Sequence, residues 1–201
     1  MNIKYPFMVE FTGTPEAGKT TCIKEVVRHL EEQGFKVGFI KESAEILPSF
    51  IPKSSFDAHL YMRLQTIISI ITSKYSNYDI VLIDRGIIDG IIFTQKFSVD
   101  NPNNIKECNS LILLLDTLRN VLLPNMLIVF SCSPQTSIKR RGGEGRIVTL
   151  DFVKSYNTLL ESFHAEPPTS QYNLNTTNRS KEQVASQVIK VIKNEYTKAR
   201  N

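Results

Sequence analysis

A glycine-rich segment at residues 13–20, GTPEAGKT, carries the clearest chemistry in this 201-residue chain. It matches the pattern G-x-x-x-x-G-K-[ST], in which successive backbone N–H groups form a nest for phosphate oxygens. Lys19 would reach the β- and γ-phosphates of a nucleotide, and the Thr20 hydroxyl would bind Mg²⁺. A strand pattern precedes the loop and a helical pattern follows it, as the motif requires, whereas a chance match would need neither. We predict ATP contacts from Gly13, Thr14, Pro15, Glu16, Ala17, Gly18, Lys19 and Thr20.

Two acidic residues follow predicted strands. Asp84 ends the apolar run DIVLID at 79–84, and Glu42 follows FKVGFI at 35–40. Because ligands of parallel sheets bind outside the carboxyl ends of the strands, both acids should lie at one site. Asp84 would join Thr20 at the Mg²⁺, and Glu42 would accept a proton from a substrate hydroxyl. The alternatives are an aspartate that only caps a turn and a solvated loop glutamate.

A basic, glycine-rich segment follows the fourth predicted strand, and we assign residues 138–148 to a small lid. Arginines that close over a transferring phosphoryl group stabilise its negative charge, and glycines supply hinges. Arg140, Arg141 and Arg146 are the candidates for this catalytic role, beside Lys19. A solvated surface turn and a small nucleic-acid patch are the alternatives.

The elements that must position these groups alternate between short apolar runs and helical patterns, which predicts βαβ units. Strands are expected at 7–11, 35–40, 79–84, 126–131 and 172–175. Helices are expected to begin near residues 19, 56, 107, 150 and 181. We therefore predict an α/β protein with the three-layer P-loop fold: a five-stranded parallel sheet, helices on both faces and a small lid. A single domain should span residues 1–201.

Several helical patterns make narrower predictions. Thr149 should cap the helix that begins at 150, and Ser180 with Gln183 forms a capping box. The leucine stripe of 107–122 suits either a buried core helix or the interface of a homodimer. The inward face of the helix at 56–75 is predicted to hold Leu60, Leu64, Ile67, Ile68 and Ile71. His29, His59 and His164 lack partners at ligand spacing, so we predict structural roles for them.

Charge and composition narrow the class of partner. The chain holds 24 basic and 20 acidic residues, a net charge of +4. The segments 139–146 and 181–201 each carry an excess of three positive charges, so the basicity is local. This favours a small anionic substrate over a nucleic-acid polymer. Three widely spaced cysteines, no apolar leader and no stretch long enough to span a membrane predict a cytoplasmic protein without membrane attachment.

The order of these motifs resembles the thymidylate kinase and deoxynucleoside kinase branch of the P-loop kinases. The resemblance runs over almost the whole chain, and the stretches that carry it lie between residues 10 and 177: EFTGTPEAGKTT, EEQGFKVGFIKES, YMRLQTII, VLIDRG, PNMLIVFSCSPQTSIKRR and YNLNTT. The resemblance implies an α-phosphate contact for Thr21, acceptor contacts for Glu42, Arg63 and Gln65, and a phosphate contact for Arg85. It also places Asn175, Thr176 and Thr177 beside the adenine base.

Three departures leave the acceptor open. Ser43-Ala44 stands where thymidylate kinases carry Pro-Gly-Gly, and Ser131 replaces an aspartate. Gly86 stands where those kinases carry Tyr, His or Phe and deoxynucleoside kinases carry Ser. The run DRGIIDG, with Asp89, also resembles nicotinamide-riboside-kinase-like domains. We expect Mg²⁺- and ATP-dependent phosphoryl transfer to a nucleoside or nucleoside monophosphate. The alternatives are a kinase for a non-nucleotide metabolite and an ATPase switch without an acceptor.

Overall fold

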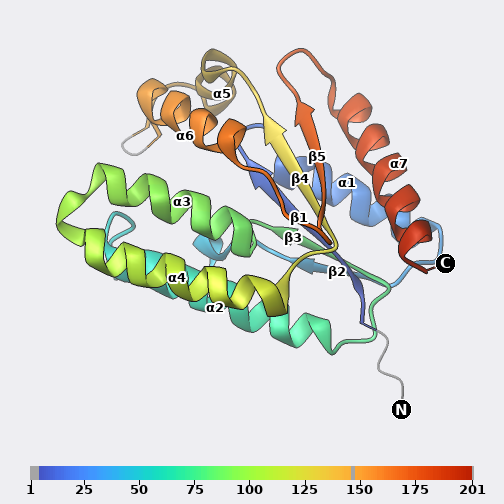
Figure 1. The fold of residues 1–201 in the computed structure, drawn as a ribbon. Coiled ribbons are helices and arrows are strands. Elements are labelled where there is room, and N and C mark those ends of the chain that lie inside the picture. The colour runs from blue at the N-terminus through green and yellow to red at the C-terminus, as the bar shows by residue number, and fades with distance from the viewer. Residues whose placement is uncertain (1–4, 146–147, 201) are drawn as a thin grey trace.

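The protein folds around a parallel sheet of five strands in the order β2-β3-β1-β4-β5 (Figure 1). The computed structural model describes residues 5–145 and 148–200. The strands are β1 (Phe7–Gly13), β2 (Val37–Ile40), β3 (Ile80–Asp84), β4 (Met126–Ser131) and β5 (Ser170–Asn175). The predicted five-stranded parallel sheet is confirmed, although β2 begins two residues later than expected.

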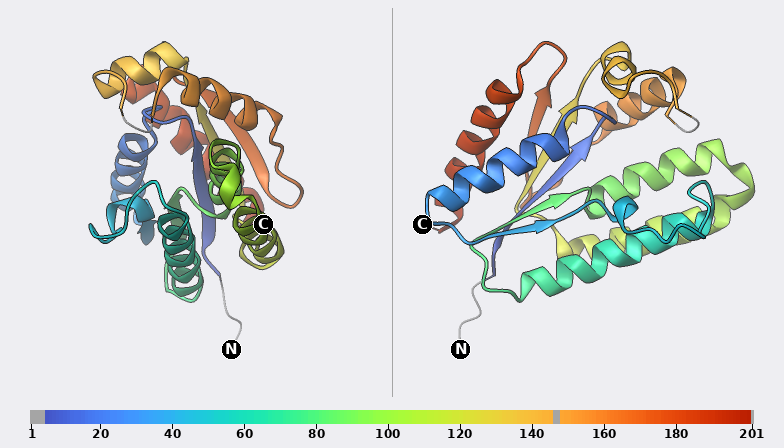
Figure 2. Two further views of the ribbon diagram at one scale, coloured as in Figure 1. Left: turned by 90° about the vertical axis from the view of Figure 1, so that its left-hand side faces the viewer. Right: turned by 180° about the vertical axis from the view of Figure 1, so that it is seen from behind.

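Helices cover both faces of the sheet, so the molecule has the three layers predicted (Figure 2). On one face lie α1 (Lys19–Glu32) and α7 (Lys181–Arg200), which contact each other. The other face carries α2 (Phe56–Lys74), α3 (Ile87–Asp100), α4 (Ile105–Leu122) and α6 (Leu150–Ser162). The short α5 (Pro134–Arg141) follows the carboxyl end of β4, and two single 3₁₀ turns lie at Ser43–Glu45 and Pro102–Asn104. No helix in the described ranges is long and apolar enough to cross a membrane.

The central strand β1 sends alternate side chains to the two faces, as a strand must. Val9 and Phe11 enter the core beneath α1 and α7, and Met8 enters the core beneath α2, α3 and α4. Glu10 and Thr12 follow Met8 on that second face, and both are fully buried. Polar side chains therefore replace apolar ones on one face toward the carboxyl end of the strand.

Helix α3 was not predicted from the sequence. Its residues Ile87, Ile88, Ile91 and Ile92 are all buried, and they contribute to two different cores. Because α3 packs against α4, α6 and β1, it has no polar face opposite an apolar one. The one-sided periodicity that identifies a surface helix is therefore missing from its sequence.

The predicted inward face of α2 is wrong for three of its five residues. Leu64 is 43% exposed, Ile68 56% and Ile71 43%. The buried face instead combines apolar residues with His59, Arg63 and Thr66. This face borders a cavity as well as the core, so polar residues occupy positions that the periodicity assigns to solvent.

The predicted helix caps are confirmed. The Thr149 hydroxyl accepts a hydrogen bond from the Phe152 amide at 3.1 Å. In the capping box, the Ser180 amide donates to Gln183 Oε1 at 2.9 Å and the Gln183 amide donates to Ser180 Oγ at 3.2 Å. These bonds satisfy N–H groups that have no partner inside the helix.

The leucine stripe predicted at 107–122 lies on α4 and is only partly buried. Leu115 is fully buried, while Leu114 is 41% exposed.

Candidate active site

The loop between β1 and α1 has the tight geometry that its glycines allow. Gly13 has a φ of 132°, and a Cβ at this position would lie 1.9 Å from the Phe130 carbonyl oxygen. Gly18, with a φ of 92°, precedes the first turn of α1. The Thr14 hydroxyl donates to Asn157 Oδ1 at 2.6 Å, which joins the loop to α6. The predicted phosphate-binding loop therefore has both its strand and its helix in place.

Lys19 lies inside this loop, with only 5% of its surface exposed. Its ammonium donates to the carbonyl oxygens of Gly13 and Thr14 at 2.9 and 2.8 Å. Burial lowers the pKa of Lys19 to about 8, and the nearby charge of Arg85 contributes to the lowering. The carboxylates of Asp89, Asp84 and Glu42 oppose this lowering, but none of them forms a hydrogen bond with the ammonium, so a direct contact with an anion such as phosphate would still favour its charge.

Thr20 and Asp84 meet as predicted. The Thr20 hydroxyl donates to Asp84 Oδ2 at 2.5 Å, and the buried Asp84 Oδ1 has no hydrogen-bond partner among the described residues. Burial raises the pKa of Asp84, although the Thr20 hydrogen bond and Lys19 oppose the rise. A hydroxyl and a carboxylate oxygen are the few protein ligands that Mg²⁺ takes beside nucleotide phosphates. The described residues hold no group of three His, Cys, Asp or Glu side chains able to bind a metal alone.

A cavity of about 290 Å³, the phosphate cavity, lies above the loop and α1. Arg141 lines it and approaches Glu16 to 3.7 Å. Arg140 instead donates to the Thr176 carbonyl at 2.7 Å, so its position does not support contact with the transferring phosphoryl group. Consecutive residues of a helix diverge by about 100°, which separates the two arginines. Arg146 lies outside the described residues. The other lining residues are Pro15, Gly18, Lys19, Thr20, Thr21, Glu42, Arg85, Phe93 and Val148.

A second cavity of about 470 Å³, the outer cavity, lies between the start of α1 and the loop after β5. Arg140, Thr21 and Thr176 line it. Asn175 and Thr177 do not line it. The Asn175 side chain accepts from the Thr177 amide at 2.9 Å, and the Thr177 hydroxyl accepts from the Ser133 amide at 3.0 Å. Of the three residues predicted to contact the base, only Thr176 lines this cavity, and its hydroxyl donates to the Ala17 carbonyl at 2.9 Å.

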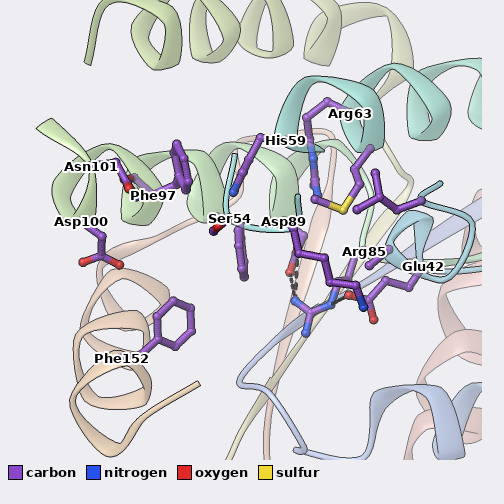
Figure 3. A pocket seen from close by; sticks show the side chains of 15 residues that line it. Glu42, Ser54, His59, Arg63, Arg85, Asp89, Phe97, Asp100, Asn101 and Phe152 are labelled. Carbon is purple, nitrogen blue, oxygen red and sulfur yellow. Dashed lines mark hydrogen bonds and ion pairs between the residues drawn. The ribbon is translucent and has the colours of Figure 1, made fainter. Parts of the chain in front are cut away.

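A third cavity of about 350 Å³, the aromatic cavity, opens between α2, α3 and α6 (Figure 3). Phenylalanines and other apolar side chains form much of its wall, and charged groups gather at its inner end. Its lining residues include Glu42, Leu47, His59, Met62, Arg63, Arg85, Asp89, Phe93, Phe97 and Phe152. Such a wall, apolar with a few convergent polar groups, is typical of a small-molecule site.

Arg85 is the centre of the charged end of the aromatic cavity. Its Nε pairs with Glu42 Oε1 at 2.8 Å, and its Nη1 pairs with Asp89 Oδ1 at 3.1 Å (Figure 3). Asp89 is fully buried and also accepts from the hydroxyls of Thr12, at 2.7 Å, and Tyr156, at 3.1 Å. Burial opposes ionisation of Asp89, but the neighbouring arginines outweigh it and lower its pKa. The arginine is therefore fixed from two sides.

Arg63 has no such partner. It is 6% exposed, and its Nε and Nη1 have no hydrogen-bond partner among the described residues. It packs against Gly90, where a Cβ would lie 3.0 Å from Nη1. Gln65 is only half-buried and does not line the aromatic cavity, because residues two apart on a helix point about 200° apart. Of the two helix residues that the resemblance places at the acceptor, Arg63 lines this cavity and Gln65 does not.

His59 packs on Phe97 with 3.9 Å between ring centroids, and it lines the same cavity. Burial, with Arg63 nearby, lowers the pKa of His59 to about 4, so the ring is neutral near physiological pH. The sequence predicted a structural role only. Phe93 and Phe97 were also missed, since they belong to the unpredicted α3, and Asp89 was noticed only as part of a resemblance. For His59, a sequence signal would have been a polar residue among the buried positions of α2, which indicates that this face borders a cavity.

Comparison with known proteins agrees with this fold. No family model matches the sequence, and no curated protein matches it. Among solved structures, thymidylate kinase from Candida albicans is 16% identical over 96% of this chain and 94% of its own, with a TM-score of 0.67. Deoxyadenosine kinase from M. mycoides, solved with bound dATP, is 21% identical over 92% of this chain and 99% of its own, with a TM-score of 0.68. The chain thus has the fold of these P-loop kinases, as its motifs suggested.

Proposed function

We propose that this protein transfers a phosphoryl group from Mg²⁺-bound ATP to a small acceptor, a nucleoside or a nucleoside monophosphate. One observation carries the proposal. The phosphate cavity and the aromatic cavity share Glu42, Arg85 and Phe93 in their walls. Two small molecules bound in adjoining cavities would meet at Glu42 and Arg85, and phosphoryl transfer depends mainly on such positioning.

On the donor side, the loop amides and Lys19 would bind the ATP phosphates. Thr20 and Asp84 would hold Mg²⁺, which offsets charge on the phosphate oxygens when it is bound. Lys19 would exchange its two carbonyl partners for phosphate oxygens, and Arg141 would approach from α5. Thr21 and Thr176 line the outer cavity, which is large enough for the adenine and ribose.

On the acceptor side, Glu42 would accept the proton of an acceptor hydroxyl, and Arg85 would hold the acceptor's reacting end. Phe93, Phe97 and Phe152 offer flat apolar surfaces for a planar ring. The unpartnered guanidinium of Arg63 offers donors to a carbonyl or anionic group of the acceptor. The proposal that the acceptor carries a base rests on these features.

A coupled assay for ADP release tests the function. The panel contains nucleosides, nucleoside monophosphates and small metabolite alcohols. Stimulation by a nucleoside or monophosphate supports the proposal, and stimulation only by other alcohols points to a metabolite kinase. If no acceptor raises turnover above slow hydrolysis, the chain acts as an ATPase switch. Lys19→Ala should lower turnover by about 100-fold or more, and full retention of turnover would contradict the donor site.

Glu42→Gln separates the two kinds of acceptor. A hydroxyl acceptor needs a base, so loss of the carboxylate should reduce turnover by about 100-fold. A phosphate acceptor arrives already ionised, so turnover should change little. Glu45→Gln is the matched control, because Glu45 does not line either cavity.

Two further expectations remain predictions. The three cysteines are free and buried, in keeping with the expected cytoplasmic location. Leu113 and Val121 of α4 are 68% and 62% exposed, in keeping with a homodimer. Light scattering of the purified protein measures its mass in solution and tests the second expectation.

A further inference from the structure

Glu10 stands in the central strand β1 with none of its surface exposed. Its paired neighbours on β3 and β4 are Ile83 and Leu127, both apolar. A carboxylate is among the costliest side chains to place in such surroundings unless it has hydrogen-bond donors. Glu10 lies before the G-x-x-x-x-G-K-[ST] motif, and no step of the proposed reaction uses it.

The donors come from the first turn of α3, nearly 80 residues further along the chain. Glu10 Oε1 accepts from the Asp89 amide at 2.7 Å, and Oε2 accepts from the Ile88 amide at 3.3 Å. The first amides of a helix have no partners within it. Gly86, which precedes the first turn, supplies no side-chain cap. Glu10 therefore caps α3 from another element, with both oxygens of its carboxyl group at the amide end of the helix.

Gly86 leaves the room that this cap needs. A Cβ at Gly86 would lie 2.4 Å from Glu10 Oε2 and 2.5 Å from its carboxyl carbon. Any larger residue would collide with the carboxylate. Glu10 and Gly86 thus form a matched pair, which gives a physical reason for glycine where the kinases that the sequence resembles carry larger residues.

We propose that Glu10 is a positioning residue for the acceptor site, because it fixes the first turn of α3 and, through it, Arg85 and Asp89. The proposal rests on the proposed function for the meaning of that site. The Asp89 amide donates to the Glu10 carboxyl group, and the Asp89 carboxylate pairs with Arg85. Arg85 has a φ of 64°, a backbone conformation that costs energy for any residue with a side chain, so the turn must be held in place.

Nuclear magnetic resonance of the full chain tests this without any acceptor. The probe is the Nε–H signal of Arg85, assigned by its loss in Arg85→Lys. We expect Glu10→Ala to shift or broaden this signal and to speed amide exchange at Ile88 and Asp89 by about tenfold or more. Glu10→Gln retains one acceptor oxygen and should give a smaller change in the same direction. It also decides the question if the alanine variant does not fold.

Val9→Ala is the control for a general loss of stability. Val9 adjoins Glu10 in β1 but faces the core beneath α1 and α7. It should weaken the fold while leaving the Arg85 signal unchanged. An unchanged signal and unchanged exchange in the Glu10 variants would overturn the proposal, as would an equal response in Val9→Ala. A chain that phosphorylates none of the panel would contradict the proposed function and leave these readouts intact, so the two failures are distinguishable.

Discussion

Replacement of Glu10 by glutamine should change how the stability of the protein depends on pH. Burial raises the pKa of Glu10 from its ordinary value of 4.5 to about 7, and the charge of Asp89 adds to the rise, while the amides of α3 oppose it. Between these two values the folded state binds a proton that the unfolded state has released. The free energy of unfolding must therefore fall as the pH rises from about 4.5 to about 7.

The size of this effect follows from the difference between the two pKa values. Each pKa unit corresponds to about 1.4 kcal/mol, so the contribution of Glu10 should fall by about 3 kcal/mol across that range. Glutamine does not titrate. Asp89, whose charge raises the pKa of Glu10, is present in both proteins, so its own titration largely cancels in the difference. The difference in the free energy of unfolding, Glu10→Gln minus wild type, should therefore increase by about 3 kcal/mol between about pH 4.5 and about pH 8.

Urea unfolding of both proteins at several pH values across this range measures the difference. Glu161→Gln, an exposed replacement on α6, is the control and should follow the wild type. Curves for wild type and Glu10→Gln that stay parallel within about 0.5 kcal/mol would refute the reasoning. A difference of the opposite sign would show that the amides of α3 stabilise the carboxylate more than burial opposes it.

Three further replacements test single contacts. Gly86→Ala should lower the free energy of unfolding by about 2 kcal/mol, measured by urea, because its Cβ meets the Glu10 carboxylate; an unchanged value would contradict the close contact. Arg63→Met should leave the free energy of unfolding within about 1 kcal/mol of the wild type, because it removes a buried guanidinium whose Nε and Nη1 lack hydrogen-bond partners but also a positive charge that favours ionised Asp89, and it should weaken acceptor turnover; unchanged turnover would contradict an acceptor role. Thr149→Ala should cost about 1 kcal/mol by thermal unfolding, through loss of the bond to Phe152, and leave MgATP binding as it is.

The sequence predicted the glycine-rich loop and its flanking strand and helix well because their geometry is local. Gly13, Lys19 and Thr20 lie within one loop, where the backbone itself sets the geometry. Asp84 followed from the rule that ligands gather at the carboxyl ends of parallel strands. Residues beyond the described ranges, such as Arg146, keep their role as a prediction.

The walls of the aromatic cavity were predicted poorly because they come from helices without a one-sided pattern. Helix α3 is buried on most sides, so neither it nor Phe93 and Phe97 could be found by periodicity. On α2, His59 and Arg63 are buried because they border a cavity. The periodicity predicted instead that apolar residues on another face of this helix would be buried.

The sequence by itself therefore determined the loop that presents Gly13, Lys19 and Thr20, the meeting of Thr20 with Asp84, and the parallel sheet that carries them. Only the tertiary structure decided which side chains form the aromatic cavity, that Arg140 and Arg141 serve different cavities, and that Glu10 caps α3. The physical reason is distance along the chain. A loop and the helix after it are governed by neighbouring residues, whereas the Glu10 carboxylate and the amides of α3 meet only when the helix packs on the sheet.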